Sequence, residues 1–385
     1  MTDRDSPLVK LSEDRMNSVE LAQALVRFDS LNPPGREKDC AGYIADLLRD
    51  AGLAVTAYEF APERPSIVAR LSGTEALKPL VFTGHIDVVP LGEKPWSAPP
   101  FAAEIREGKL IGRGASDMKA GVAAFIVAAV EAAKKGRLKR GITLVITAGE
   151  ETGCEGAFHL AREGALGGAE LLIVAEPTSN LPIIAHKGSI RLRITATGKT
   201  AHSSMPELGE NAVYKVASWV GLIEALKFPE HEHPLLGRTT ASVTTIFGGQ
   251  NINSVPDSAG FTVDFRTVPA HDHQVLIADI QERLGAEASI QLVTDFKGFA
   301  TAPDEPAIEP LMDILAARLG APAVPAGAPY FTDASALVPG FNNVPTVVIG
   351  PGEAAQCHQT DEFCYVERID EAFHIYTQLI DRICR

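Results

Sequence analysis

The sequence predicts an α/β fold with two domains: a larger domain built on a largely parallel, helix-covered sheet, and a smaller α+β domain inserted into it. Three observations support this prediction. The chain has 385 residues, which is longer than a single hydrophobic core usually serves. Apolar runs alternate with helical stretches as far as Glu176, and this pattern returns near residue 305, as in helix-covered parallel sheets. Between these parts, apolar and polar residues alternate strictly, which is typical of antiparallel sheets with one covered face.

The first part of the larger domain is predicted from two kinds of pattern. Apolar residues at steps of three and four indicate helices at residues 16–28, 39–53 and 122–135. Continuous apolar runs indicate strands buried on both faces at residues 79–84, 142–147 and 171–175. The alternation of the two patterns predicts parallel strands joined by helices.

The inserted part shows the period-two pattern of half-buried strands. Such strands are predicted at residues 189–197, 241–247 and 260–268, with helices at 210–226 and 274–284. The larger domain then resumes with a helix, a strand at 344–349 and a final helix at 366–384. We therefore expect residues 1–188 and 299–385 to form one domain, and residues 189–298 to form the other.

Composition excludes several classes of partner. The formal net charge is −14 and no basic patch interrupts it, so binding to nucleic acid or to anionic lipid is not expected. No apolar segment approaches the roughly 20 residues that a bilayer requires, and the first residues contain no apolar signal core. Five cysteines without metal-binding spacing indicate reduced thiols. We therefore expect a cytoplasmic location.

Five residues able to bind metal follow strand ends or turns of the larger domain. They are His85, Asp117, Glu151, Glu176 and His358. Ligands of open α/β sheets gather outside the carboxyl ends of the strands. Each residue taken alone could be an ordinary turn or cap residue, but their occurrence after the strands of one sheet predicts a single metal site.

Mixed imidazole and carboxylate ligands indicate two divalent metal ions, with Zn²⁺ as the first choice and Co²⁺ as an alternative. Two ions separated by roughly 3.5–4 Å need a bridging carboxylate, and Asp117 is the candidate for it. His85 and Glu176 would hold one ion, and Glu151 and His358 the other.

Two further acids have predicted roles beside the ions. Glu150 precedes a candidate ligand and is free to act as general acid and base for an attacking metal-bound hydroxide. Asp87 lies two residues after His85, so both side chains point the same way on an extended strand end. It would orient the metal-binding histidine or the acid beside it.

These motifs together resemble the acetylornithine deacetylase and succinyl-diaminopimelate desuccinylase family, which is similar to carboxypeptidase G and the aminoacylases. The resemblance spans nearly the whole chain. It is carried by Gly84-His-Ile-Asp-Val-Val-Pro90, Gly112-Arg-Gly-Ala-Ser-Asp117-Met-Lys, Gly149-Glu-Glu-Thr-Gly153, Glu176-Pro-Thr and Gly350-Pro-Gly…His358. It implies a di-zinc amidohydrolase with an inserted lid and dimerisation domain, and the same metal ligands and general acid/base.

The resemblance also implies roles for residues outside the metal site. His202 matches a histidine that steadies the oxyanion in the partner subunit's site, Asn253 a polar contact of the lid, and Arg266 a ligand for the substrate carboxylate. Thr332 falls in a loop that matches a substrate-contacting loop loosely. A homodimer formed through the inserted domain is therefore expected.

The expected activity is hydrolysis of the amide bond of a small N-acyl amino acid, with acetylornithine-type deacylation first. Desuccinylation and cleavage of a small dipeptide are alternatives, and a non-catalytic metal-binding scaffold is a remote one. One departure from the family bears on this choice. His186-Lys187-Gly188-Ser189 stands where desuccinylase relatives tend to carry a paired arginine before Gly-Ser.

Overall fold

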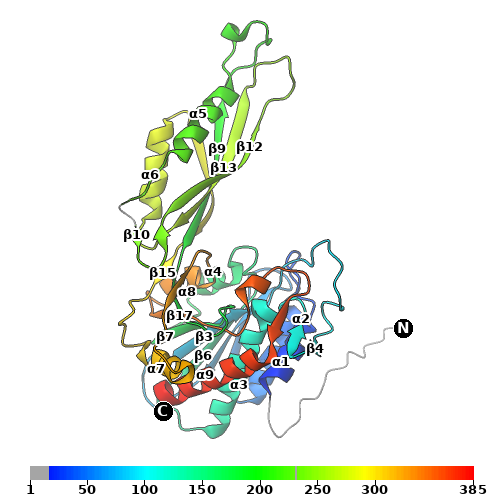
Figure 1. Ribbon diagram of the computed structural model, residues 1–385, viewed down its shortest axis with the longest axis vertical. Coiled ribbons are helices and arrows are strands. Elements are labelled where there is room, and N and C mark those ends of the chain that lie inside the picture. Colours follow the sequence, from blue (N-terminus) through cyan, green and yellow to red (C-terminus); the bar gives the residue numbers. More distant parts are fainter. Residues whose placement is uncertain (1–16, 230–231) are drawn as a thin grey trace, which may run out of the picture. The chain divides into compact units, whose positions relative to one another are not determined.

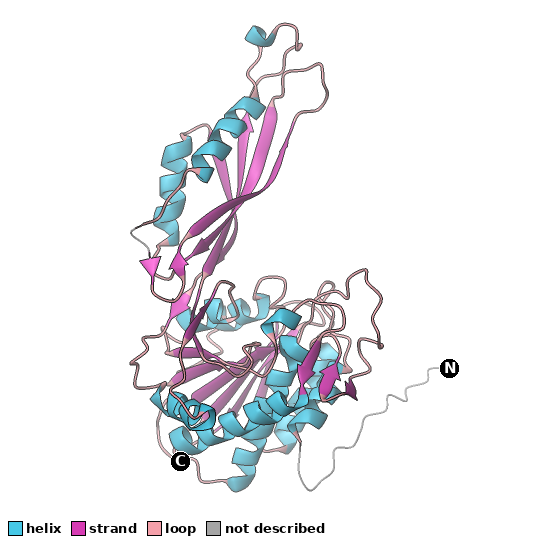
Figure 2. Ribbon diagram, in the orientation of Figure 1, coloured by secondary structure: helices cyan, strands magenta, loops and turns pink. Residues whose placement is uncertain are grey.

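The computed structural model describes residues 17–229 and 232–385 of the chain. These divide into two compact units. Within the described residues, the larger comprises 17–184, Thr301–Pro325 and Thr332–Arg385, and the smaller comprises 185–229, 232–300 and Ala326–Phe331. Figure 1 shows the order of their elements, and Figure 2 shows that the larger unit is a helix-covered sheet while the smaller combines helices with antiparallel strands. This is the fold class that the sequence predicts.

The central sheet, most of which lies in the larger unit, has the strand order β1-β2-β6-β3-β7-β17-β8-β15 (β15, Phe299–Ala300), and β16 (Ala326–Ala328) also pairs with β8. Its strands are β1 (Ala54–Glu59), β2 (Pro65–Leu71), β6 (Ile142–Thr147), β3 (Leu80–His85), β7 (Leu171–Val174), β17 (Thr346–Val348) and β8 (Ile183–His186). The four strands from β6 to β17 are parallel, whereas β1, β2 and β8 pair antiparallel. The β1–β2 connection is too short for a crossover, so that pair can only be antiparallel.

Helices cover both faces of this sheet (Figure 1). They are α1 (Ser18–Val26), α2 (Lys38–Asp50), α3 (Ala120–Lys135), α4 (Glu155–Arg162), α7 (Glu309–Leu319), α8 (Ala334–Gly340) and α9 (Val366–Cys384). The sequence of α3 is apolar on nearly all sides, and α1 and α9 pack against it. Helices α4 and α8 pack against each other. A small sheet of β4 (Glu104–Arg106), β5 (Lys109–Ile111) and β18 (Phe363–Tyr365) completes this unit.

The smaller unit is an antiparallel sheet with two helices on one face. The strand order is β12-β13-β9-β14. Its elements are β9 (Gly188–Thr197), β12 (Thr240–Gly248), β13 (Ser258–Thr267), β14 (Ala288–Phe296), α5 (Ala212–Glu224) and α6 (His273–Leu284). Alternate residues of β9, including Ile190, Leu192 and Ile194, are buried in one core with apolar residues of the helices. The period-two pattern thus arises from a sheet with one covered face.

Three helices begin at a side chain that satisfies free backbone N–H groups. Asn17 accepts from the N–H of Val19 at 2.8 Å at the start of α1, and Asn211 and Asp272 act in the same way at the starts of α5 and α6. Such caps typically contribute about 1 kcal/mol each. Within the described ranges, no helix has the length and apolar character needed to cross a bilayer.

Candidate metal centre

Three neighbouring parallel strands end at the same edge of the central sheet. His85 is the last residue of β3 and pairs with Thr147, the last residue of β6. Glu150 and Glu151 follow Thr147 after a short turn at Gly149 with a φ of 75°. Because β7 is parallel to β3 and in register with it, Glu176 leaves the sheet at this edge too.

The five candidate ligands lie together around Asp117. One oxygen of Asp117, Oδ1, is 3.1 Å from Nε2 of His85, and that nitrogen is 3.8 Å from Oε1 of Glu176. The other oxygen, Oδ2, is 3.6 Å from Nε2 of His358, which in turn is 3.1 Å from Oε2 of Glu151. Asp117 therefore stands between two pairs of residues, each consisting of one imidazole and one carboxylate.

The chemistry of this group fits divalent cations. Burial raises the pKa of Glu176 well above its ordinary value, and the charge of Asp117 adds to the effect. The pKa of Glu151 is raised by the same two causes. Oε1 of Glu151 is buried and has no hydrogen-bond partner within residues 17–229 and 232–385. Three crowded carboxylates with one free oxygen are groups that bound cations would neutralise.

Asp87 organises both sides of this centre. Nδ1 of His85 lies 3.0 Å from the backbone carbonyl of Asp87, so an Nδ1–H donates there and Nε2 is left facing Asp117. The Asp87 carboxylate accepts the backbone N–H groups of Glu150 and Glu151, each at 3.1 Å. Burial opposes ionisation of Asp87, but the hydrogen bond and charge of His85 hold its pKa below the ordinary value.

The side chain of Glu150 belongs to a second group of residues, which we call the Glu150 cluster: Glu150, Cys154 and Asp333. One potential ligand atom from each lies within 4.8 Å of the others. Glu150 is only 9% exposed. Burial raises its pKa well above the ordinary value, and Glu176 and Glu151 add to this effect while His85 opposes it.

Three supporting residues carry no sequence signal that marks them. Glu362 accepts the backbone N–H groups of Gly114, Ser116 and Asp117, at 3.0, 2.8 and 3.0 Å. Asn32 donates to Asp87 at 2.8 Å. Asp333 accepts from the hydroxyl of Thr147. All three act through loops, and apolar periodicity does not reveal which loops approach the site.

Thr332 also belongs to the larger unit, where it is 1% exposed. Its hydroxyl accepts the backbone N–H of Ala334 at 3.1 Å, just where α8 begins. A substrate contact by Thr332 therefore remains a prediction.

The remaining candidates belong to the smaller unit. His202 and Asn253 are exposed. Nδ1 of His202 accepts from the backbone N–H of Ser204 at 3.2 Å. Nε of Arg266 lies 3.1 Å from Asp264 Oδ1, so its guanidinium already has one carboxylate partner.

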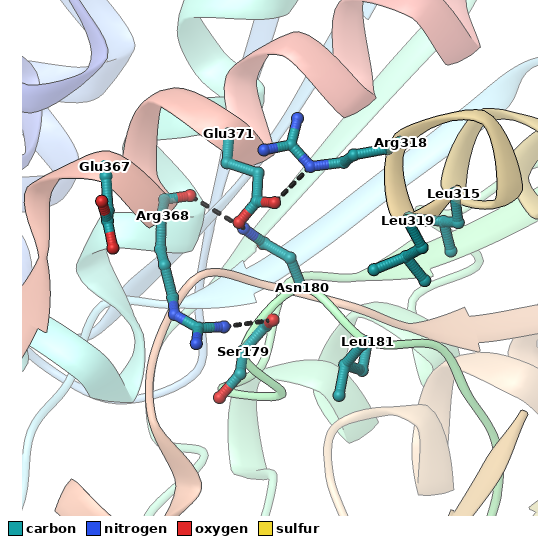
Figure 3. Close-up of a pocket in the computed structure, with 9 residues that line it drawn as sticks. All are labelled: Ser179, Asn180, Leu181, Leu315, Arg318, Leu319, Glu367, Arg368 and Glu371. Carbon is teal, nitrogen blue, oxygen red and sulfur yellow. Dashed lines mark hydrogen bonds and ion pairs between the residues drawn. The ribbon is translucent and has the colours of Figure 1, made fainter. Parts of the chain in front are cut away.

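A separate cavity of about 640 Å³ in the larger unit contains none of the candidate site residues (Figure 3). It is lined by Ser179, Asn180, Leu181, Leu315, Arg318, Leu319, Glu367, Arg368 and Glu371. Arg318 pairs with Glu371, and Arg368 donates to the backbone carbonyl of Ser179 (Figure 3). These contacts tie α7 and α9 to the segment that follows Glu176.

Comparison with known proteins gives concordant results. The profile described as peptidase family M20/M25/M40 matches residues 81–382. A protein of Staphylococcus epidermidis named probable succinyl-diaminopimelate desuccinylase is 31% identical to this chain. The alignment, gaps included, is 402 residues long and covers 94% of this chain and 98% of that protein.

Two solved structures are similar over nearly the whole chain. The aminopeptidase PepT of Bacillus cereus has a TM-score of 0.76 at 22% identity, covering 94% of this chain and 97% of that one. The metallo-carboxypeptidase Sso-CP2 of Sulfolobus solfataricus has a TM-score of 0.78 at 18% identity, covering 95% and 99%. At these identities they support the fold alone.

Proposed function

This chain belongs to peptidase family M20/M25/M40 and is a metal-dependent hydrolase, and we propose that it cleaves the amide bond of a small N-acyl amino acid. The observation that carries the proposal is the position of Asp117, with one oxygen toward His85 and the other toward His358. A carboxylate placed in this way is suited to bridge two divalent cations. Zn²⁺ is the first choice for them and Co²⁺ the second.

Each of the surrounding residues has a distinct task in this proposal. His85 and Glu176 hold one cation, and Glu151 and His358 hold the other. Bound cations supply Lewis acidity, which polarises the amide carbonyl and lowers the pKa of water toward about 7. Glu150 takes the proton of the attacking water and returns it to the departing nitrogen. Asp87 fixes the turn that carries Glu150 and Glu151 through their backbone N–H groups.

The acyl group of the substrate is inferred from the names of the relatives and from two basic side chains, Lys187 and Arg266. The sequence patterns favour an N-acetyl substrate, but the relative from Staphylococcus epidermidis is named a desuccinylase, which puts N-succinyl substrates first. In the smaller unit, Lys187 is 8% exposed, and its pKa is lowered by burial and by the charge of Arg266. The ammonium group of Lys187 donates to the backbone carbonyl of Arg238 at 2.6 Å, which leaves two N–H groups for a substrate carboxylate. An N-succinyl group carries such a carboxylate.

A hydrolysis screen tests this proposal. N-succinyl and N-acetyl amino acids and small dipeptides are offered to the enzyme loaded with Zn²⁺ or Co²⁺, before and after a chelator. We expect N-succinyl amino acids to be cleaved fastest, the activity to disappear with the metal, and added Zn²⁺ to restore it. Fastest cleavage of the N-acetyl substrates or the dipeptides would favour those alternatives. Full metal loading without any hydrolysis would indicate a non-catalytic scaffold.

Lys187→Met separates the acyl groups. Loss of a charged hydrogen bond costs about 1.5–3 kcal/mol, so kcat/KM should fall at least about tenfold for N-succinyl substrates and little for N-acetyl substrates. Lys134→Met, on the exposed side of α3, is the matched control. An equal fall for both acyl groups would remove Lys187 from acyl recognition.

The smaller unit is proposed as a lid that also forms a homodimer. Strand β12 is at the edge of its sheet, and Ile246 and Phe247 at its end are 61% and 37% exposed. An exposed apolar edge strand is a ready surface for pairing with a second copy. Ile246→Lys should produce monomers in sedimentation velocity, and a dimer that persists would place the interface elsewhere.

All five cysteines are free, which supports a reducing compartment such as the cytoplasm.

A further inference from the structure

The Glu150 cluster contains two buried polar groups to which the proposed reaction gives no task. Cys154 is fully buried and Asp333 is 2% exposed. They stand immediately before α4 and α8, two helices that pack against each other in Figure 1. Strand β6 ends beside them, since Thr147 donates its hydroxyl to Oδ2 of Asp333. The cluster therefore connects the end of β6 with the starts of α4 and α8, next to Glu150.

The backbone of Glu150 is held more firmly than its side chain. Its N–H donates to Asp87, and its carbonyl accepts the N–H groups of Gly153 and Cys154 at 2.8 and 2.9 Å. On its carboxylate, Oε1 accepts from the thiol of Cys154 at 3.7 Å. In the part of the chain that the structure describes, no residue donates a hydrogen bond to Oε2. One oxygen thus faces the cluster and the other is free for the reaction.

Asp333 has one oxygen that remains to be explained. Oδ2 is bound to Thr147, but Oδ1 is buried and lacks a hydrogen-bond partner within the described ranges. An unpaired buried oxygen is costly, and two buried carboxylates within 4.8 Å repel each other unless a proton lies between them. Burial raises the pKa of Asp333 to about 6, although the hydrogen bond from Thr147 opposes this. A proton on Oδ1, directed toward Glu150, would both satisfy this unpaired oxygen and remove the repulsion between the two carboxylates.

We propose that Asp333 is a positioning residue of the hydrolase: held by Thr147, it donates a hydrogen bond from Oδ1 to Glu150 and, with Cys154, fixes the direction of the Glu150 carboxylate. The inference rests on the proposed role of Glu150. Glu150 has several rotatable bonds, and a misplacement of about 1 Å at a reacting group can cost about a hundredfold in rate. Asp333 itself need not touch the substrate.

Three variants test the geometry. Asp333→Asn keeps both contacts, because the amide oxygen accepts from Thr147 and the amide N–H donates to Glu150. Asp333→Ala removes both. We expect Asp333→Ala to lower kcat by about 10- to 100-fold with KM and metal content unchanged, and Asp333→Asn to stay within about threefold of the parent. Asp313→Ala, an exposed acid on α7, is the control. Equal losses in Asp333→Asn and Asp333→Ala would overturn the positioning role.

Coupling to Glu150 is the readout that a merely structural role would not produce. If Asp333 acts through Glu150, adding Asp333→Ala to Glu150→Gln should cost no further activity. A full additional loss in the double variant contradicts the inference. Should Asp333→Ala fail to fold, Cys154→Ala and Cys154→Ser test the same cluster. A higher kcat in Cys154→Ser than in Cys154→Ala would support positioning of Glu150 by the cluster, and equal losses of kcat would overturn it.

The assay also separates this inference from the proposed function. A parent enzyme that cleaves no N-acyl amino acid counts against the proposed function. An active parent, an inactive Glu150→Gln variant and a fully active Asp333→Ala variant together count against the positioning role alone.

Discussion

Arg113 and Glu362 form an ion pair with an Nη1–Oε2 distance of 2.7 Å, and their side chains are only 2% and 1% exposed. The same carboxylate accepts three backbone N–H groups from residues 114–117. A buried charge pair persists only when its remaining lone pairs are satisfied, and these N–H groups satisfy them. The pair therefore holds the loop that presents Asp117.

Glu362→Ala should destabilise the fold and weaken metal binding together. Removal of one partner of a buried pair typically costs about 3–5 kcal/mol, because Arg113 is left buried without its partner. Loosening the Asp117 loop should also lower metal affinity by about 10- to 100-fold. Denaturant unfolding and metal competition measure the two effects. Glu104→Ala, which breaks the exposed Arg106 pair, should leave both unchanged. Normal metal affinity in Glu362→Ala would show that the loop does not depend on this pair.

Asp117→Asn should release both cations, whereas Glu176→Gln should release one. The distances place Asp117 between two ligand pairs and Glu176 beside His85 alone. Replacing a carboxylate by a neutral amide removes the charge that a hard or borderline cation needs. Metal content after dialysis, measured by mass spectrometry, gives the stoichiometry. Two retained ions in Asp117→Asn would exclude the bridging assignment.

Glu150→Gln should bind metal normally and lose turnover by about 10²- to 10⁴-fold, the usual contribution of general acid–base catalysis. The neighbouring Glu151→Gln should instead lose metal. Glu155→Gln, whose carboxylate bonds to Thr152 and Arg64, should keep both metal and turnover. Loss of metal in Glu150→Gln would make that residue a ligand and not the proton carrier.

The convergence of the candidate ligands was predictable where they follow buried strands. His85, Glu151 and Glu176 come after β3, β6 and β7, and parallel strands bring their carboxyl ends to one edge. The pattern of the smaller unit was equally informative, because one covered face produces strict alternation. The antiparallel margins of the central sheet were not anticipated. The apolar pattern of β1 and β2 does not indicate whether these strands run parallel or antiparallel to their neighbours.

Residues that act through loops could not be predicted in the same way. Glu362 is one acid in a short polar stretch, and only the folded chain shows that three backbone N–H groups converge on it. Asp333 follows the predicted Thr332, but it is the carboxyl of Asp333 that lies in the Glu150 cluster. Periodicity gives the direction of strands and helices, whereas contacts between distant loops depend on tertiary packing.

His186 should make stability depend on pH. It is fully buried, and burial lowers its pKa from 6.5 to about 4. Between these values the unfolded chain binds a proton that the folded chain does not, so stability falls as pH falls through this window. The full shift corresponds to about 3 kcal/mol. Denaturant unfolding of the parent and of His186→Gln from pH 7 to pH 4 measures it. The variant should lose less stability on acidification, and parallel curves would contradict the prediction.

The ring of His202 is set up as a hydrogen-bond donor. The backbone N–H of Ser204 donates to Nδ1, so a neutral ring carries its proton on Nε2. If His202 donates to the oxyanion, as the family resemblance implies, His202→Ala should lower kcat about a hundredfold or more, because such a donor contributes about 3–4 kcal/mol. Because His202 is exposed, the fold should be unaffected. Ser204→Ala keeps the backbone N–H and should cost much less.

Mixing two inactive variants decides which subunit supplies this donor. His202→Ala keeps Glu150, and Glu150→Gln keeps His202. If His202 acts across a homodimer, random re-association should restore about one quarter of the parental activity, since half of the dimers are mixed and each mixed dimer has one complete site. If His202 serves its own subunit, every site lacks one group and the mixture should stay inactive. Activity recovered in proportion to the fraction of mixed dimers would therefore establish the dimer as the catalytic unit.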